Sequence, residues 1–378
     1  MIDHSSNLVP VGHCDLAPDG AAMQVLVKDG YAYVGHVGKS RYGTSIVDVR
    51  DPRNPRVIAR LDVPLGTHSH KVQLSEDFLY VNYERNWHEK PHPGHWKAGM
   101  GVFDVTNPRD PREIGFLPME GIGVHRMAFV APSRVFLSGS AEGYTDQFLR
   151  IIDVSRPTNL VEVGRWWLEG MAEGEETARR DWPRGRRYAC HHPVVRGDRA
   201  YCGWWDAGAI ILDISDNSSP KLVSRMAFPE SESHHTHTAL PLPGRDVLLV
   251  VDEQIEETPD AKPQLIRVLD IADERNPRII GKLPTPVGDF ARRPGRFGPH
   301  NLHEMQPGSW ISSDVVFATF FNAGLRVYDV SDARTPSEIG HFTPDDCLVN
   351  DLYVGEDGLV YLTDRAGSGL YIAQWQPS

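Results

Sequence analysis

The chain has 378 residues and a net charge of −12, with 24% charged residues, which argues against a general nucleic-acid-binding surface. No apolar run is long enough to span a bilayer, so no membrane partner is expected. The start of the chain, MIDHSSNLVP, has neither the basic segment nor the apolar core of a signal peptide, and the four cysteines lack metal-binding or disulfide spacing. We therefore expect a cytoplasmic protein.

A repeated motif divides the chain into units of about 50–60 residues, a spacing typical of propeller blades. It consists of a hydrophobic residue, an Asp-Val or Asp-Ile pair and a turn rich in Pro, Asn and Asp. Six copies cover residues 47–55, 103–111, 152–160, 212–220, 269–277 and 328–336, and a degenerate seventh covers residues 370–375. Around each copy we predict four short strands, the third of which ends in the Asp-Val or Asp-Ile pair.

The two ends of the chain complement each other. The last repeat stops at its third strand, whereas residues 6–16 at the start parallel residues 158–168, which contain a fourth strand. The first strand of the chain is therefore predicted to complete the last blade, because a closed ring leaves only short, protected strand edges. The prediction is an all-β, seven-bladed β-propeller that forms a single domain over residues 1–378.

These repeats resemble the LVIVD-repeat β-propeller family, whose signature is the hydrophobic-Asp-Val strand, and the resemblance covers nearly all of the chain. It implies the propeller fold. The family signature does not include any histidine, so the histidines need a separate argument.

Histidine recurs at one slot near the start of the first strand in five of the seven repeats. An apolar residue follows each slot two positions later. The slot residues are His70, His125, His192, His237 and His303, with Met23 and Asn350 in the other two repeats. On a propeller these imidazoles converge on the axis, and neutral imidazoles are ligands for divalent transition metals. His68 and His235 remain alternatives to their neighbours His70 and His237.

Five longer insertions fall on the face where the first strands begin, at residues 84–100, 141–148, 169–190, 253–264 and 284–299. They are predicted to cover the metal site. They and their surroundings are rich in tryptophan and arginine, which suit a small organic substrate that is aromatic and anionic.

Several neutral imidazoles suit Fe(II), Mn(II), Cu(II) or Zn(II), and Fe(II) is the expected metal, with Mn(II) or Zn(II) as alternatives. The site geometry resembles that of the propeller oxygenases that cleave carotenoids and stilbenes with four histidines on iron. This resemblance implies a mononuclear non-heme Fe(II) oxygenase acting on an aromatic or unsaturated organic acid. No other cofactor is expected.

Two alternatives remain. The first is a Mn(II)- or Zn-dependent lyase or hydrolase, for which the oligogalacturonate lyases offer a similar histidine-rich site. The second is a propeller scaffold without catalytic activity. For an enzyme, we expect Tyr188, Glu304 and Arg126 as catalytic residues. Glu304, Asp351, Glu84, Asp252 and Glu253 are candidates to orient the imidazoles by accepting their remote N–H groups.

Overall fold

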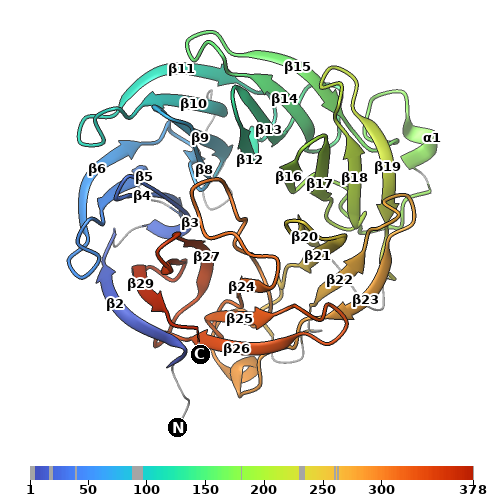
Figure 1. The fold of residues 1–378 in the computed structure, drawn as a ribbon. Coiled ribbons are helices and arrows are strands. Elements are labelled where there is room, and N and C mark those ends of the chain that lie inside the picture. The colour runs from blue at the N-terminus through green and yellow to red at the C-terminus, as the bar shows by residue number, and fades with distance from the viewer. Residues whose placement is uncertain are drawn as a thin grey trace.

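The computed structural model describes residues 5–16, 20–38, 41–86, 97–179, 181–229, 235–258, 261 and 264–377. Seven antiparallel sheets are arranged like blades around a common axis, and Figure 1 views the ring along that axis. The prediction of an all-β, seven-bladed propeller is confirmed. Within each blade the strands follow one another from the axis outward.

The first three blades follow the chain in order. Blade 1 contains β3 (Gly20–Lys28), β4 (Tyr31–Gly38), β5 (Tyr42–Asp48) and β6 (Arg56–Asp62). Blade 2 contains β7 (Thr67–His68), β8 (Val72–Leu74), β9 (Phe78–Arg85), β10 (Gly99–Asp104) and β11 (Arg112–Pro118). Blade 3 contains β12 (Val124–Val130), β13 (Arg134–Gly139), β14 (Phe148–Asp153) and β15 (Val161–Trp166).

The next two blades are equally regular. Blade 4 contains β16 (His192–Arg196), β17 (Arg199–Gly203), β18 (Ala209–Asp213) and β19 (Lys221–Met226). Blade 5 contains β20 (Thr236–Pro241), β21 (Val247–Asp252), β22 (Ile266–Asp270) and β23 (Arg278–Lys282). Among the described residues the only helices are α1 (Glu176–Arg179) and the short 3₁₀ helix η1 (Phe290–Arg292), and neither is long and apolar enough to cross a membrane.

The last two blades use both ends of the chain. Blade 6 contains β24 (Val315–Thr319), β25 (Leu325–Asp329) and β26 (Ser337–Phe342), to which β1 (Ser5–Ser6) adds at the outer edge. Blade 7 contains β27 (Val349–Val354), β28 (Leu359–Asp364) and β29 (Gly369–Trp375), and β2 (Leu8–Cys14) forms its outer strand. The antiparallel pairing of β2 with β29 confirms that the N-terminal strand completes the last blade.

The repeated aspartate has a local structural role. In blade 2 the Asp104 carboxylate accepts a hydrogen bond from the backbone N–H of Thr106, and Asp213 and Ser215 repeat this contact in blade 4. Such a bond from an aspartate to the backbone two residues later is an Asx turn. It ends the third strand and starts the connection to the fourth, which explains why the motif recurs once per blade.

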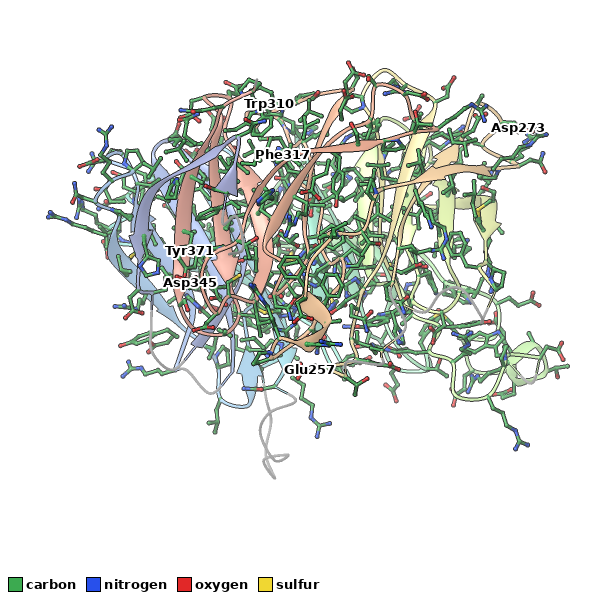
Figure 2. All side chains as sticks on the ribbon, turned by 90° about the horizontal axis from the view of Figure 1, so that it is seen from below. Glu257, Asp273, Trp310, Phe317, Asp345 and Tyr371 are labelled. Atoms are coloured by element: carbon green, nitrogen blue, oxygen red, sulfur yellow. The ribbon has the colours of Figure 1, made fainter. Side chains whose placement is uncertain are left out.

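The two faces of the ring differ in their connections. Figure 2 shows the molecule from the side, with Glu257 and α1 toward one face and Trp310 and Asp273 toward the other. We call the face of Glu257 and α1 the loop face, because both belong to predicted insertions, at residues 253–264 and 169–190; residues 87–96, 180, 259–260 and 262–263 of the insertions lie outside the described residues. One longer connection lies on the opposite face, between the axis and β24, and it contains Trp310.

Candidate metal site on the propeller axis

The innermost strands of blades 1, 3, 5 and 7 each contain a β-bulge where they pass the axis. The extra residue is Met23 in blade 1, His237 in blade 5 and Asn350 in blade 7, and in blade 3 the bulge spans His125 and Arg126. A bulge places two residues opposite one residue of the partner strand and turns the extra side chain out of the regular alternation. Consecutive residues of each inner strand can therefore both face the axis.

Backbone hydrogen bonds extend this pattern to the other blades. His191 N–H donates to the carbonyl of Gly203, the residue that His192 also opposes, and His300 N–H donates to the carbonyl of Thr319. The bulged slot, in order of the blades, holds Met23, His70, His125, His191, His237, His300 and Asn350. The next position holds Gln24, Lys71, Arg126, His192, Thr238, Asn301 and Asp351.

The structure therefore corrects two of the five predicted slot residues. His70, His125 and His237 lie in the slot, but His191 replaces His192 in blade 4 and His300 replaces His303 in blade 6. The sequence alignment relied on an apolar residue two positions after the histidine, a rule that assumes the same register in every inner strand. In blade 6 the inner segment makes only the isolated bridge between Leu302 and Ala318, so that register does not apply.

His303 lies away from the other histidines. Its Nε2 contacts the carbonyl oxygen of Trp310 at 2.9 Å, and its ring packs edge-on against Tyr353 at 5.8 Å. Trp310 belongs to the face opposite the loop face. His303 therefore holds the connection that contains Trp310, which precedes β24 of blade 6, and packs it against blade 7.

The imidazoles near the axis form a continuous arc, which we call the histidine ring. Its members are His68, His70, His125, His191, His237 and His300. Neighbouring ring centroids are 4.7, 4.9, 4.5, 4.2 and 4.5 Å apart in that order. His68, an alternative to His70 in the sequence, is thus present together with it, whereas His235 packs on Trp205 at 5.1 Å outside the arc.

Three members of the histidine ring have their Nδ1 hydrogen committed to a fixed acceptor. His125 Nδ1 is 3.0 Å from Glu84 Oε1, and His191 Nδ1 is 3.2 Å from the carbonyl oxygen of His237. His300 Nδ1 is 2.6 Å from the carbonyl oxygen of Asn350, a distance that requires an N–H on the ring. In a neutral imidazole the other nitrogen, Nε2, then carries the lone pair that a metal needs.

His70 and His237 differ from these three because the lone pair of each imidazole already accepts a hydrogen bond. The side-chain amide of Asn82 donates to His70 Nδ1 at 3.1 Å, and Arg126 donates to His237 Nε2 at 3.1 Å. The second nitrogen of His237 donates to Thr238 Oγ1 at 2.6 Å. The open Nε2 atoms therefore belong to His125, His191 and His300.

Two buried carboxylates adjoin the histidine ring. Glu84 lies 3.1 Å from His68 Nε2 and 3.8 Å from His70 Nε2, and Glu253 lies 3.6 Å from His300 Nε2. Two groups of donor atoms are close enough to hold a metal ion: His68, His70 and Glu84, and His191, His237 and Glu253. Each carboxylate therefore completes a mixed nitrogen and oxygen ligand set.

Electrostatics keep the imidazoles neutral. Burial holds the pKa of His70, His191, His237 and His300 well below the usual histidine value, and burial also lowers the pKa of His125. Burial alone would raise the pKa of Glu84, but His125 and His68 outweigh it and keep that pKa below its usual range. Neutral imidazoles beside an ionised carboxylate are the protonation states that metal binding requires.

Three charged residues lie in the positions after the slot, and Glu304 lies near them at 3.8 Å from Arg126; we call Lys71, Arg126, Asp351 and Glu304 the charged layer. Arg126 donates to His237 and to Asn301 Oδ1 at 2.8 Å, and its guanidinium lies 3.8 Å from Glu304. Lys71 Nζ and Asp351 Oδ2 are buried, 4.0 Å apart, and neither makes a hydrogen bond within the described residues.

The predicted catalytic residues thus have different positions. Arg126 contacts the histidine ring directly, and Glu304 lies 3.2 Å from His192 Nε2 in the charged layer. Tyr188 is buried in a loop-face cluster with Trp182 and Arg225, and no contact joins it to a ring histidine among the described residues. Of the candidate orienting carboxylates, Glu84 contacts two imidazoles, whereas Asp252 is paired with Arg267.

A cavity lies at the opposite end of the axis from the loop face. It has a volume of about 1250 Å³, and its wall includes Ala128, Phe129, Val194, Met305 and Glu304. It reaches the charged layer at Glu304 but includes no residue of the histidine ring. The predicted loop-face tryptophans Trp87 and Trp96 lie outside the described residues.

Comparisons with known proteins agree with this architecture. The LVIVD repeat family matches residues 19–63, 143–167 and 193–227, and no curated protein matches the chain. The RRP9 WD40 repeats superpose with a TM-score of 0.63 at 8% identity, covering 97% of both chains. The Cps50 (Swd1) β-propeller domain of Myceliophteria thermophila gives 0.61 at 12% identity, covering 97% of this chain and 99% of that one.

A hypothetical selenium-binding protein from Sulfolobus tokodaii gives a TM-score of 0.57 at 12% identity, covering 92% of this chain and 82% of that one. At such identities these likenesses establish the fold alone. The repeat match, the seven sheets and the closure by the first strand agree with one another. The chain is therefore a seven-bladed β-propeller that contains LVIVD repeats at residues 19–63, 143–167 and 193–227, with histidine and glutamate donor atoms on its axis that lie close enough together to hold a metal ion.

Proposed function

We propose that this protein is a metal-dependent enzyme that binds one divalent transition metal between His125 and His191. Further ligands come from His300 and Glu253 along the same arc. Fe(II) is the proposed metal, and the proposed activity is a non-heme oxygenase reaction on an aromatic or unsaturated organic acid.

One contact is the main support for a bound metal. The Nε2 atoms of His125 and His191 are only 2.8 Å apart, although both rings already use their Nδ1 hydrogens elsewhere. Two lone pairs at this distance repel each other unless a cation lies between or beside them. Burial lowers the pKa of both imidazoles, which disfavours a shared proton. A metal bonded to two imidazoles at 2.0–2.1 Å brings its ligand nitrogens to about 2.8–3.4 Å from each other, so the contact fits a pair of metal ligands.

The donor set favours a redox-active metal. Imidazoles with one carboxylate are the ligands of non-heme Fe(II) oxygenases, in which open coordination positions receive dioxygen and substrate. Met23 and Asn350 occupy the slots of blades 1 and 7, so the arc of imidazoles spans only the other five blades. This gap supports an accessible position on one side of the metal. A bound Fe(II) would supply the activation of dioxygen, while Glu84 and the Asn350 carbonyl orient the imidazoles.

The metal is tested by elemental analysis of protein purified without chelators or a metal-affinity column. We expect about one metal ion per chain, and iron would support the oxygenase. His191→Ala should lose most of it, because this change removes one of the two facing Nε2 atoms. His303→Ala and the exposed His13→Ala serve as controls and should retain it. Failure of the wild-type protein to retain Fe(II), Mn(II) or Zn(II) after anaerobic addition would exclude the proposed function.

The reaction class needs a separate measurement. Oxygen consumption in the presence of aromatic acids should require both the metal and air. A bound manganese or zinc ion with turnover that persists without oxygen would instead support a lyase or hydrolase.

A further inference from the structure

The arc of imidazoles is interrupted at blades 7 and 1, where other side chains occupy the slot. Asn350 occupies the slot in blade 7, and its side-chain amide donates to the carbonyl of Met23, the slot residue of blade 1, at 2.7 Å. This bond ties the two slots that lack histidine to each other.

Arg365 lies beside Asn350. It follows β28 on the loop face, and its backbone N–H donates to the carbonyl of Leu348, just before β27. Its guanidinium NH1 is 3.5 Å from Asn350 Oδ1. Asn350 thus connects Arg365 to the backbone that holds His300, since the Asn350 carbonyl accepts the His300 Nδ1 hydrogen at 2.6 Å.

Arg365 has no direct carboxylate partner among the described residues. Within that part of the chain its side chain makes one long hydrogen bond, to Asn350, and no carboxylate lies within ion-pair distance. By contrast, the nearby Arg296 is paired with Glu253 at 3.0 Å and with Glu257 at 3.3 Å. A guanidinium has five N–H donors, and a partly buried one without an anion is unfavourable. Arg365 is therefore suited to an anion from outside the chain.

Phe321 fixes the position of Arg365 relative to the histidine ring. The Arg365 guanidinium lies over the Phe321 ring at 5.8 Å, and the same ring packs against His300 at 4.8 Å. Phe321 is buried and has a left-handed backbone with a φ of 44°. Such strain in a residue other than glycine persists only where the surroundings hold it, and it is common at functional sites.

We propose that Arg365 binds the carboxylate of an organic acid at the open side of the histidine ring, next to the metal. The planar guanidinium can hold both oxygens of a carboxylate at once, an arrangement that fixes orientation as well as position. The acid enters from the gap at blades 1 and 7, and its carbon skeleton faces His125, His191 and His300. This inference rests on the proposed function for the identity of the reaction, but not for the anion site itself.

The anion site is tested on metal-free protein with benzoate, and with benzamide as a neutral molecule of the same shape, by isothermal titration calorimetry. Arg365→Gln should weaken benzoate binding at least about tenfold, the usual effect of losing a charge-assisted bidentate contact, and should leave benzamide binding unchanged. Arg365→Lys keeps the charge without the planar fork and should give an intermediate loss.

Arg292→Gln is the matched control, because it removes the same charge from an exposed site in η1 and should not change benzoate binding. The inference is overturned if the wild-type protein shows no saturable benzoate binding, or if Arg365→Gln and Arg365→Lys both bind benzoate as the wild-type protein does. Metal content, measured for the same variants before the metal is removed for calorimetry, separates the two proposals. Loss of benzoate binding without loss of metal supports Arg365 alone, whereas absence of metal with Arg365-dependent benzoate binding rejects only the metalloenzyme.

Discussion

At the scale of single residues, the central feature is a set of imidazoles that burial keeps uncharged. Burial lowers the pKa of His36, His192 and His303 to about 4, and it holds the pKa of four histidines of the ring well below the usual histidine value. These groups make the fold sensitive to acid, because the same side chains titrate near pH 6.5 in an unfolded chain.

The metal-free protein should lose stability as the pH falls from 7.5 to 5. Above pH 6.5 both states are neutral and the histidines contribute no pH dependence. Below pH 6.5 these histidines become protonated in the unfolded chain, whereas in the folded protein they stay neutral down to about pH 4. By pH 5, each of His36, His192 and His303 therefore lowers the free energy of unfolding by on the order of 1–2 kcal/mol. Thermal unfolding across this range measures the effect. His36→Gln should reduce the slope, and a melting temperature that is constant from pH 7.5 to 5 would contradict the assignment.

The sequence predicted the location of the site, but it identified only some of the histidines that form it. The repeat placed His70, His125 and His237 on the axis because each lies two positions before an apolar residue of the inner strand. His191 and His300 were missed because a bulge shifts the register by a residue that leaves no mark in the hydrophobic pattern. The available signal was the pair of adjacent polar residues at the slot and the next position, as in His70 and Lys71 or His191 and His192.

At the scale of elements, the site depends on how closely neighbouring blades approach. Glycines on the second strands of two blades make this approach possible. A Cβ on Gly35 would lie 2.6 Å from the backbone carbon of His70, and one on Gly203 would lie 2.2 Å from the carbonyl oxygen of His237. The bulges that aim these histidines at the axis are therefore packed against glycine backbone of the preceding blade.

Gly203→Ala should displace β20 and disturb the metal site. The added methyl group meets backbone atoms of His237 that cannot move alone, so we expect a loss of about 1–3 kcal/mol together with reduced metal content. Gly197→Ala in the same blade is the control. No atom lies within 4 Å of its added Cβ, and its φ of +54° should cost only about 1 kcal/mol without changing metal content. Equal metal content in the two variants would show that blade spacing does not position the ring.

Element boundaries follow from the sequence where the chemistry is local. The aspartate of each repeat predicts the end of the third strand because its Asx turn is formed within three residues. The inner segment of blade 6 was harder to predict, since the histidines and asparagine around Leu302 bond to side chains and carbonyls around the axis instead of forming a regular strand. Long-range partners of this kind leave no local periodicity.

At the scale of the whole molecule, the ring is closed by the start of the chain. The sequence predicted the pairing of β2 with the last blade from its similarity to another fourth strand. It did not predict that β1 also adds to β26, because Ser5 and Ser6 carry no strand pattern. The first strands thus join blades 6 and 7 to each other and cover the outer edges of both.

Leu8 tests how much this closure stabilises the ring. It is 2% exposed, pairs with Trp375 and packs with Phe317 and Phe342, so it joins the N-terminal strand to the cores of both final blades. Leu8→Ala should lower the free energy of unfolding by about 2–4 kcal/mol, as for other buried leucines. The adjacent Val9 is 45% exposed, and Val9→Ala should change it by less than about 0.5 kcal/mol.

Denaturant unfolding of both variants gives the comparison, and size-exclusion chromatography shows whether the edges of β26 and β29 become available to other molecules. If Leu8→Ala and Val9→Ala both change the free energy of unfolding only slightly, blades 6 and 7 hold together without the N-terminal strand. A large effect of Leu8→Ala alone means that the histidine ring is assembled only when the first strand has closed the propeller. His300 and Asn350 lie in these last two blades, so metal content should then fall together with stability.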